Sequence, residues 1–123
     1  MPLQKSLNYL TLLIFGPLLI LIGILGFIMT AQPTSTAPAY NIFHLFFGVI
    51  GIILLLLKKE PLMAAFNIGF GAIDLYQAVA SFAGIFPQQL FQWTVVDDVL
   101  HVIIGAGLVL IGLYGRYVGT FRS

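Results

Sequence analysis

The sequence predicts an all-α integral membrane protein, a bundle of four transmembrane helices made of two helical hairpins that repeat one another in parallel. Three observations support this fold class. Only 7% of the 123 residues are charged and 60% are hydrophobic, whereas roughly a quarter of the residues in soluble domains carry a charge. The chain holds four apolar stretches long enough to cross a membrane. Its cations all fall on one side of those stretches.

Length and composition limit the classes of function that the chain can have. The 123 residues fit one transmembrane domain covering 1–123, with no room for a separate soluble catalytic domain. The absence of cysteine excludes disulfides, thiolate metal sites and thiol nucleophiles. A net charge of +1 gives no reason to expect a nucleic-acid partner.

The four predicted spans are separated by proline-containing or charged segments. We expect them at residues 7–31, 40–57, 62–86 and 93–117. The first stretch is longer than the apolar core of a secretory signal peptide, so we expect it to be a span. Because lipid offers no hydrogen-bonding partners to the backbone, each span is expected to be a helix.

Charge placement predicts an orientation. The cations precede the first span, separate the second from the third, or follow the fourth: Lys5, Lys58, Lys59, Arg116 and Arg122. Since such residues stay on the cytoplasmic side, both termini should be cytoplasmic, in a bacterial inner or thylakoid-type membrane. The uncharged 32–39 and 87–92 loops should then lie on the outer side. We expect four aromatic residues at the membrane interfaces, namely Tyr40, Trp93, Tyr114 and Tyr117.

Each span carries one face of small or polar residues at helical spacing. On the third span this face includes Asp74, Gln77 and Ser81, an intramembrane polar stripe. Glycine faces allow close helix approach, and polar groups avoid lipid tails. These faces are therefore expected to meet at the centre of the bundle.

An internal repeat carries both histidines of the chain. A shift of 57 residues superposes four pairs: Asn41 on Asp98, His44 on His101, Gly48 on Gly105 and Lys59 on Arg116. Because each repeat contains two spans, the two copies share one orientation. The two histidines should therefore lie at the same side of the membrane and at similar depth, near the outer face.

The residues around these histidines are similar to an uncharacterised bacterial family of small four-span membrane proteins, a domain of unknown function. The similarity rests on the N-x-x-H-L-x-x-G pattern from Asn41 to Gly48 and the D-[ND]-x-L-H-x-x-x-G pattern from Asp97 to Gly105. It covers most of the chain. The resemblance implies the four-span fold and its topology.

The repeated motif admits a structural and a functional interpretation. Structurally, Asn41 and Asp98 each precede a histidine by three residues and can accept its ring N–H. Thr94 and Asp97 also resemble a capping box. Functionally, His44 and His101 could ligate a tetrapyrrole, haem b or a chlorophyll-type pigment. Asn41 and Asp98 would then orient the rings, and Gly48 and Gly105 would leave space for the macrocycle.

Three other interpretations use the same polar residues. A metal site could draw on the two histidines with Asp97 and Asp98. A proton path could run through Asp74. A hydrolase would need a Ser81–His101–Asp98 arrangement.

We expect no catalytic residues and no dedicated metal site. The expected function is that of a non-enzymatic accessory or structural subunit of a larger membrane assembly, with tetrapyrrole binding as the alternative. The expected partners are the lipid bilayer and other membrane subunits or further copies of the chain.

Overall fold

A computed structural model describes residues 6–29 and 33–118, and only the backbone of 116–118. All regular secondary structure in these described residues is helical. Its elements, in chain order, are α1 (Leu7–Ile28), α2 (Pro38–Leu57), α3 (Glu60–Ala83), the short α4 (Gln88–Phe91) and α5 (Val95–Val118). The all-α prediction and the four predicted spans are confirmed, whereas α4 was not anticipated.

The four long helices are each long and apolar enough to cross a membrane, as an integral membrane protein requires. Their outward faces carry large apolar side chains, among them Phe82, which is 94% exposed, and Leu56, which is 75% exposed. Such faces are stable against lipid chains, whereas in water they would be a liability.

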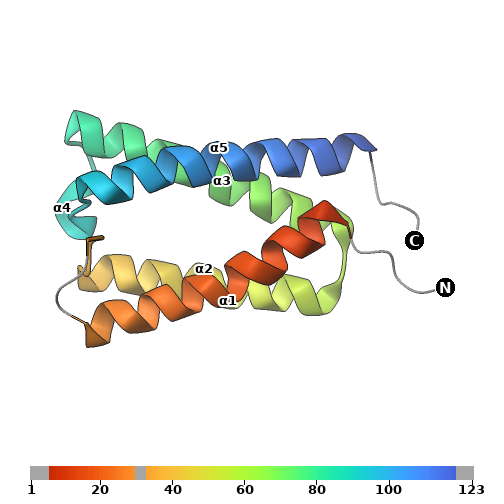
Figure 1. Ribbon diagram of the computed structural model, residues 1–123, viewed down its shortest axis with the longest axis horizontal. Coiled ribbons are helices and arrows are strands. Elements are labelled where there is room, and N and C mark those ends of the chain that lie inside the picture. Colours follow the sequence, from red (N-terminus) through yellow and green to blue (C-terminus); the bar gives the residue numbers. More distant parts are fainter. Residues whose placement is uncertain (1–5, 30–32, 119–123) are drawn as a thin grey trace.

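Two antiparallel hairpins make up the bundle, as Figure 1 shows. α1 packs along α2, and α3 packs along α5. α2 and α5 run in the same direction, as the repeat predicts. The start of α1, the α2–α3 turn and the end of α5 lie at one end of the bundle, called here the Lys58 end. Residues 33–37 and α4 lie at the other, the α4 end.

Local sequence signals set the helix limits. The Ser6 hydroxyl caps α1 by accepting a hydrogen bond from the Tyr9 N–H at 2.9 Å. Pro38 begins α2, a position that needs no N–H donor. Gly84 adopts a left-handed conformation, φ 71°, and ends α3 at Ala83 rather than at the expected residue 86. Lys58 ends α2 in the same way with φ 55°.

Glycines join the two helices within each hairpin. A Cβ on Gly48 would lie 2.9 Å from the Ile20 backbone nitrogen in α1, and a Cβ on Gly105 would lie 2.8 Å from the Gly71 carbonyl oxygen in α3. The expected close approach is confirmed. The expectation that the small or polar faces meet at the bundle centre is wrong for these glycines, which pack inside the hairpins. Polar residues of the same faces do meet between the hairpins, as Asn8 and Asn67 show.

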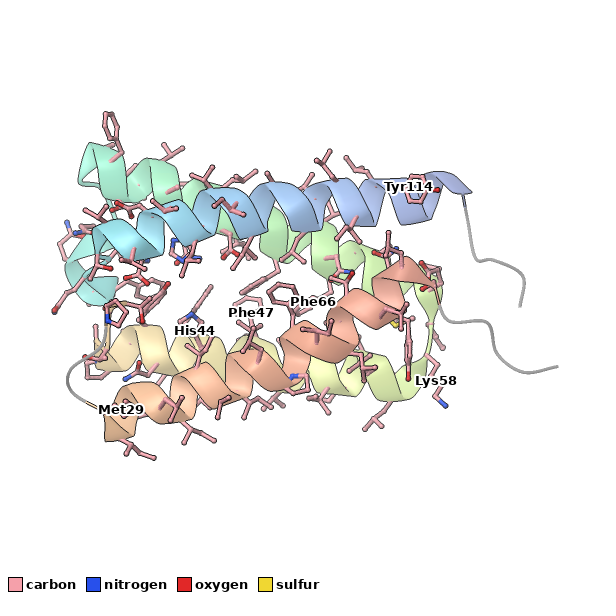
Figure 2. All side chains as sticks on the ribbon, viewed as in Figure 1. Met29, His44, Phe47, Lys58, Phe66 and Tyr114 are labelled. Carbon is pink, nitrogen blue, oxygen red and sulfur yellow. The ribbon has the colours of Figure 1, made fainter. Side chains whose placement is uncertain are left out.

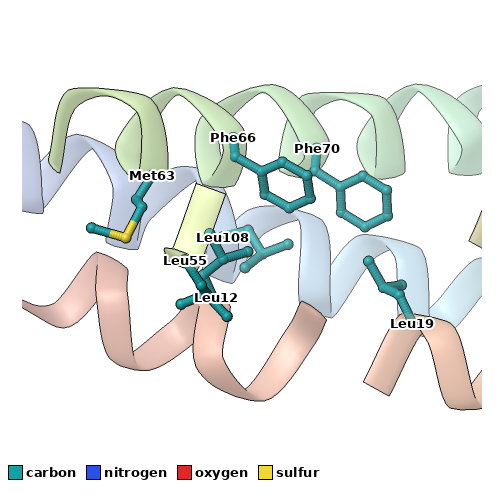
Figure 3. Close-up of a cluster of buried hydrophobic side chains, with 7 residues drawn as sticks. All are labelled: Leu12, Leu19, Leu55, Met63, Phe66, Phe70 and Leu108. Atoms are coloured by element: carbon teal, nitrogen blue, oxygen red, sulfur yellow. The ribbon is translucent and has the colours of Figure 1, made fainter. Parts of the chain in front are cut away.

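Bulky apolar side chains fill the space between the hairpins instead. Figure 3 shows this cluster, which consists of Leu12, Leu19, Leu55, Met63, Phe66, Phe70 and Leu108. Phe66 and Phe70 of α3 stack with ring centroids 5.6 Å apart. Since lipid is as apolar as this cluster, dispersion contacts rather than the hydrophobic effect stabilise it.

Polar side chains hold the hairpins together near the Lys58 end. Asn8 of α1 donates to a Glu60 carboxylate oxygen at 2.8 Å, and Asn67 of α3 donates to the Asn8 side-chain oxygen at 2.9 Å. Asn8 and Asn67 are fully buried. This contact ties α1 to α3 at the Lys58 end.

Candidate functional site: a cavity between the hairpins

A cavity of about 130 Å³ lies between the two hairpins toward the α4 end. Both histidines of the repeat line it, His44 from α2 and His101 from α5. Each is six residues beyond the first residue of its helix, Pro38 or Val95. The repeat therefore brings its two histidines to one cavity from opposite hairpins.

Tyr40 connects His101 to a carboxylate. Its hydroxyl lies 2.6 Å from Nε2 of His101 and donates to Oδ1 of Asp97 at 3.3 Å. Tyr40, Asp97 and His101 are all buried. In a nonpolar surrounding such a network rigidifies the helices that carry it, because each member loses its partner if they separate.

Asp97 also caps α5. Its Oδ2 atom accepts from the Thr94 backbone N–H at 2.8 Å, and the Thr94 hydroxyl accepts from the Asp97 N–H at 3.2 Å. This reciprocal pair is the predicted capping box. The same Oδ2 accepts from the Ser35 N–H at 2.8 Å. One carboxylate thereby joins the segment before α2 to the start of α5.

A second polar chain reaches the cavity through α3. Trp93 donates to Gln77 at 3.0 Å, and Gln77 donates to Oδ1 of Asp74 at 3.0 Å. Asp74 lines the cavity. Of the predicted polar stripe, Asp74 and Gln77 are buried, whereas Ser81 is half-buried and lies outside the cavity lining.

His44 is nine-tenths buried, with 8% of its surface exposed. Figure 2 shows it extending from α2 toward the opposite hairpin. Its ring lies 4.3 Å from the Tyr40 ring, centroid to centroid. Nδ1 is buried without a hydrogen-bond partner in the described part of the chain. A buried polar atom of this kind is costly unless something pairs with it.

The predicted orienting partners of the histidines are wrong. Asn41 donates to the Thr36 carbonyl oxygen at 3.0 Å instead of holding His44. Oδ1 of Asp98 and Nδ1 of His101 are each buried without a partner among the described residues. Helical spacing places these residues on one face but does not bring the donor and acceptor atoms into hydrogen-bonding geometry.

The predicted open space beside Gly48 and Gly105 is also absent. A Cβ on Gly48 would lie 2.5 Å from Cγ1 of Ile20, and a Cβ on Gly105 would lie 3.0 Å from Cβ of Asp74. Both glycines are used in packing within a hairpin. Neither lines the cavity.

Sequence reasoning assigned neither Tyr40 nor Trp93 to the site. Tyr40 and Trp93 were expected at the membrane interfaces. They are 2% and 6% exposed; Tyr40 bonds to His101 in the cavity lining, and Trp93 bonds to Gln77 outside it. A signal for Tyr40 existed, since the 57-residue shift superposes it on Asp97. Tyr114 is 56% exposed, and Tyr117 lies outside the described side chains.

The geometry of the described residues gives the metal interpretation no support. In the described ranges, no three His, Asp or Glu side chains are grouped so as to hold an ion. Asp98, which the metal interpretation requires, is not part of the cavity lining.

Comparisons with known proteins find no match to this chain among family models, curated proteins or solved structures.

Proposed function

We propose that the protein is a non-enzymatic accessory subunit of the membrane that holds a small or amphipathic ligand between its two hairpins. The observation that carries this proposal is the cavity itself, which collects His44, Tyr40, Asp74, Asp97 and His101 from three helices. Apolar cavities with a few converging polar groups are typical ligand sites.

The state of these polar groups supports binding rather than catalysis. Tyr40, Asp97 and His101 already bond to one another, and Asp97 additionally caps a helix. His44 is different, because neither of its ring nitrogens hydrogen-bonds to a described residue, whereas Nε2 of His101 contacts the Tyr40 hydroxyl. A ligand with a hydrogen-bonding group would pair with Nε2 of His44, the nitrogen that is not enclosed, without disturbing the network beside it.

Retention of a small molecule tests the proposal. The protein is purified in mild detergent, extracted with organic solvent, and the extract is analysed by mass spectrometry. We expect a ligand at near one-to-one ratio with the wild type. Ile22→Trp, which fills the cavity from α1, should abolish it, whereas Leu21→Trp should not, because Leu21 is 51% exposed and lies outside the lining. Equal retention by both variants, or no ligand in the wild type, would refute the proposal.

Partner subunits or further copies of this chain are proposed to contact the apolar outward faces. The reason is the exposure of large apolar side chains on these faces, such as Phe82 and Leu56. Native electrophoresis of gently solubilised membranes should show a species larger than the monomer. A monomer alone would contradict the accessory role while leaving ligand binding to the extraction experiment.

Tetrapyrrole binding is a second candidate, favoured by the two histidines that line one cavity from opposite hairpins. Two features count against it. The Tyr40 hydroxyl occupies Nε2 of His101, and the cavity of about 130 Å³ is smaller than the roughly 300–1,000 Å³ of most cofactor pockets. A Soret band that shifts with dithionite and disappears in His44→Ala and His101→Ala would establish it. A colourless preparation would exclude it.

A further inference from the structure

His44 and Asp74 line the cavity from opposite hairpins, and each keeps hydrogen-bonding capacity for a ligand. His44 of α2 makes no hydrogen bond to any described residue, and its Nδ1 is buried. Asp74 of α3 accepts one bond at Oδ1 from Gln77, and its other oxygen accepts none from the described residues. Nδ1 of His44 is enclosed by protein, so a ligand would meet this ring at Nε2. This nitrogen and the second oxygen of Asp74 can act as hydrogen-bonding poles for a ligand.

Aromatic rings line the cavity between and around these poles. Tyr40 and Phe70 lie in the lining together with Phe15 and the two histidines. Phe70 is 4% exposed, and its ring is stacked on that of Phe43 with centroids 5.9 Å apart. Rigid aromatic walls of this kind favour a flat conjugated head group, which can stack against them.

The charges around the cavity argue against an anionic head group. The lining contains two acidic side chains, Asp74 and Asp97, and no lysine or arginine. A phosphate or a fatty-acid carboxylate would therefore be buried without a counter-ion and beside acidic groups. Asp97 already accepts bonds at both oxygens, so it offers little to a cationic head.

The exposure of two lining residues indicates that the cavity opens sideways toward lipid between α1 and α5. Leu18 and Leu100 both line it, yet they are 37% and 40% exposed on the outer surface. Both lie within spanning helices, so this opening faces lipid chains rather than water. The volume of about 130 Å³ accommodates a head group, while an attached tail would have to leave through the opening.

We propose that the cavity binds the ring of a quinone-type lipid, a neutral flat ring with carbonyl or hydroxyl oxygens on a long apolar tail. A ring N–H of His44 donates to one ring oxygen, and the Asp74 carboxyl, in its protonated form, donates to another. The aromatic walls stack on the ring, and the tail passes between Leu18 and Leu100 into the bilayer. This inference rests on the proposed ligand-binding function and names the ligand class for the same site.

The chain carries its own reporter for this binding. Trp93 is the single tryptophan, is buried, and lies 6.2 Å from the His101 ring, centroid to centroid. Quinones quench tryptophan fluorescence at short range.

Purified protein in detergent, cleared of endogenous lipid, is titrated with a short-tailed benzoquinone or naphthoquinone, and Trp93 emission is recorded. An alkylbenzene with the same tail but no oxygens serves as the competitor control.

We expect saturable quenching by the quinone that the alkylbenzene does not displace. His44→Phe keeps the ring and removes the hydrogen bond, so it should weaken binding about tenfold, and Asp74→Leu should do the same. Asp98→Asn is the matched control, because Asp98 lies outside the lining, and its affinity should equal that of the wild type. Circular dichroism verifies that each variant is folded.

Non-saturable quenching, or equal quinone affinity in the wild type, His44→Phe and Asp74→Leu, overturns the inference. A fatty acid and an alkylamine of equal tail length separate this failure from that of the proposed function. If the wild type retains the fatty acid or the alkylamine but not the quinone, and Ile22→Trp abolishes that retention, the site binds a different lipid class. If the wild type retains no molecule of any kind, both the quinone inference and the proposed ligand-binding function are refuted. The comparison of quinone with alkylbenzene on the wild type decides the matter even if a variant fails to fold.

Discussion

The hydroxyl of Tyr40 lies 2.6 Å from Nε2 of His101, and the contact joins the α1–α2 hairpin to the α3–α5 hairpin beside the cavity. The same hydroxyl donates to Asp97, the residue that the 57-residue shift superposes on Tyr40. The repeat thus does more than duplicate a motif. Its two copies differ at this position, phenol in one and carboxylate in the other, and the difference makes the two halves complementary.

Removing that hydroxyl should destabilise the bundle. Tyr40→Phe leaves His101 without its described hydrogen-bond partner in a buried site, so we expect the free energy of unfolding to fall by about 1–2 kcal/mol. Unfolding in mixed micelles of increasing SDS content, followed by circular dichroism, measures the loss. Tyr76→Phe is the control, because Tyr76 is 47% exposed and donates to the Phe86 carbonyl near the surface. An equal loss of unfolding free energy in both variants would show that the Tyr40–His101 contact stabilises the bundle no more than a surface hydrogen bond does.

Glycine-to-alanine substitutions distinguish packing glycines from those that face open space. Gly48→Ala and Gly105→Ala place a methyl group within 3 Å of a partner helix and should cost about 1–3 kcal/mol of stability by overpacking. Gly107→Ala should be nearly neutral, since nothing lies within 4 Å of its added Cβ. The same unfolding assay applies. If Gly48→Ala is as stable as the wild type but no longer binds a ligand, Gly48 provides space for the ligand rather than for helix packing.

The buried amide pair near the Lys58 end should show measurable coupling. Asn67 donates to Asn8 at 2.9 Å, and interhelical hydrogen bonds in membranes couple by about 0.6 kcal/mol on average and about 1.7 kcal/mol at most. A double-mutant cycle with Asn8→Ala, Asn67→Ala and the combination measures this term. Strictly additive losses would mean that the two side chains act independently.

The orientation inferred from the cations can be tested with single cysteines, because the chain contains none. Gln89 in α4 and Lys59 at the other end are both exposed. In intact cells an impermeant maleimide should label Gln89→Cys but not Lys59→Cys, and permeabilised cells should label both. The reverse pattern would invert the predicted topology.

Charge and hydropathy predicted the fold because a membrane leaves the backbone few choices. Four apolar stretches of sufficient length must become helices, and the structure has helices at each of them. Limits shifted by a few residues where a single backbone conformation decided them, as at Gly84. Of the cations, Lys58 and Lys59 lie at the end of the bundle where α5 finishes, whereas Lys5 and Arg122 are outside the described residues.

Sequence by itself therefore determined the helices, their pairing in sequential hairpins and the two histidines as matched positions, since these follow from periodicity and repetition along one chain. Only the tertiary structure decided which atoms meet. Helical spacing suggested Asn41 for His44 and Asp98 for His101, yet Asn41 bonds to Thr36 and His101 to Tyr40. Hydrogen bonds depend on distance and angle between groups far apart in sequence, and these are fixed when the two hairpins pack, not before.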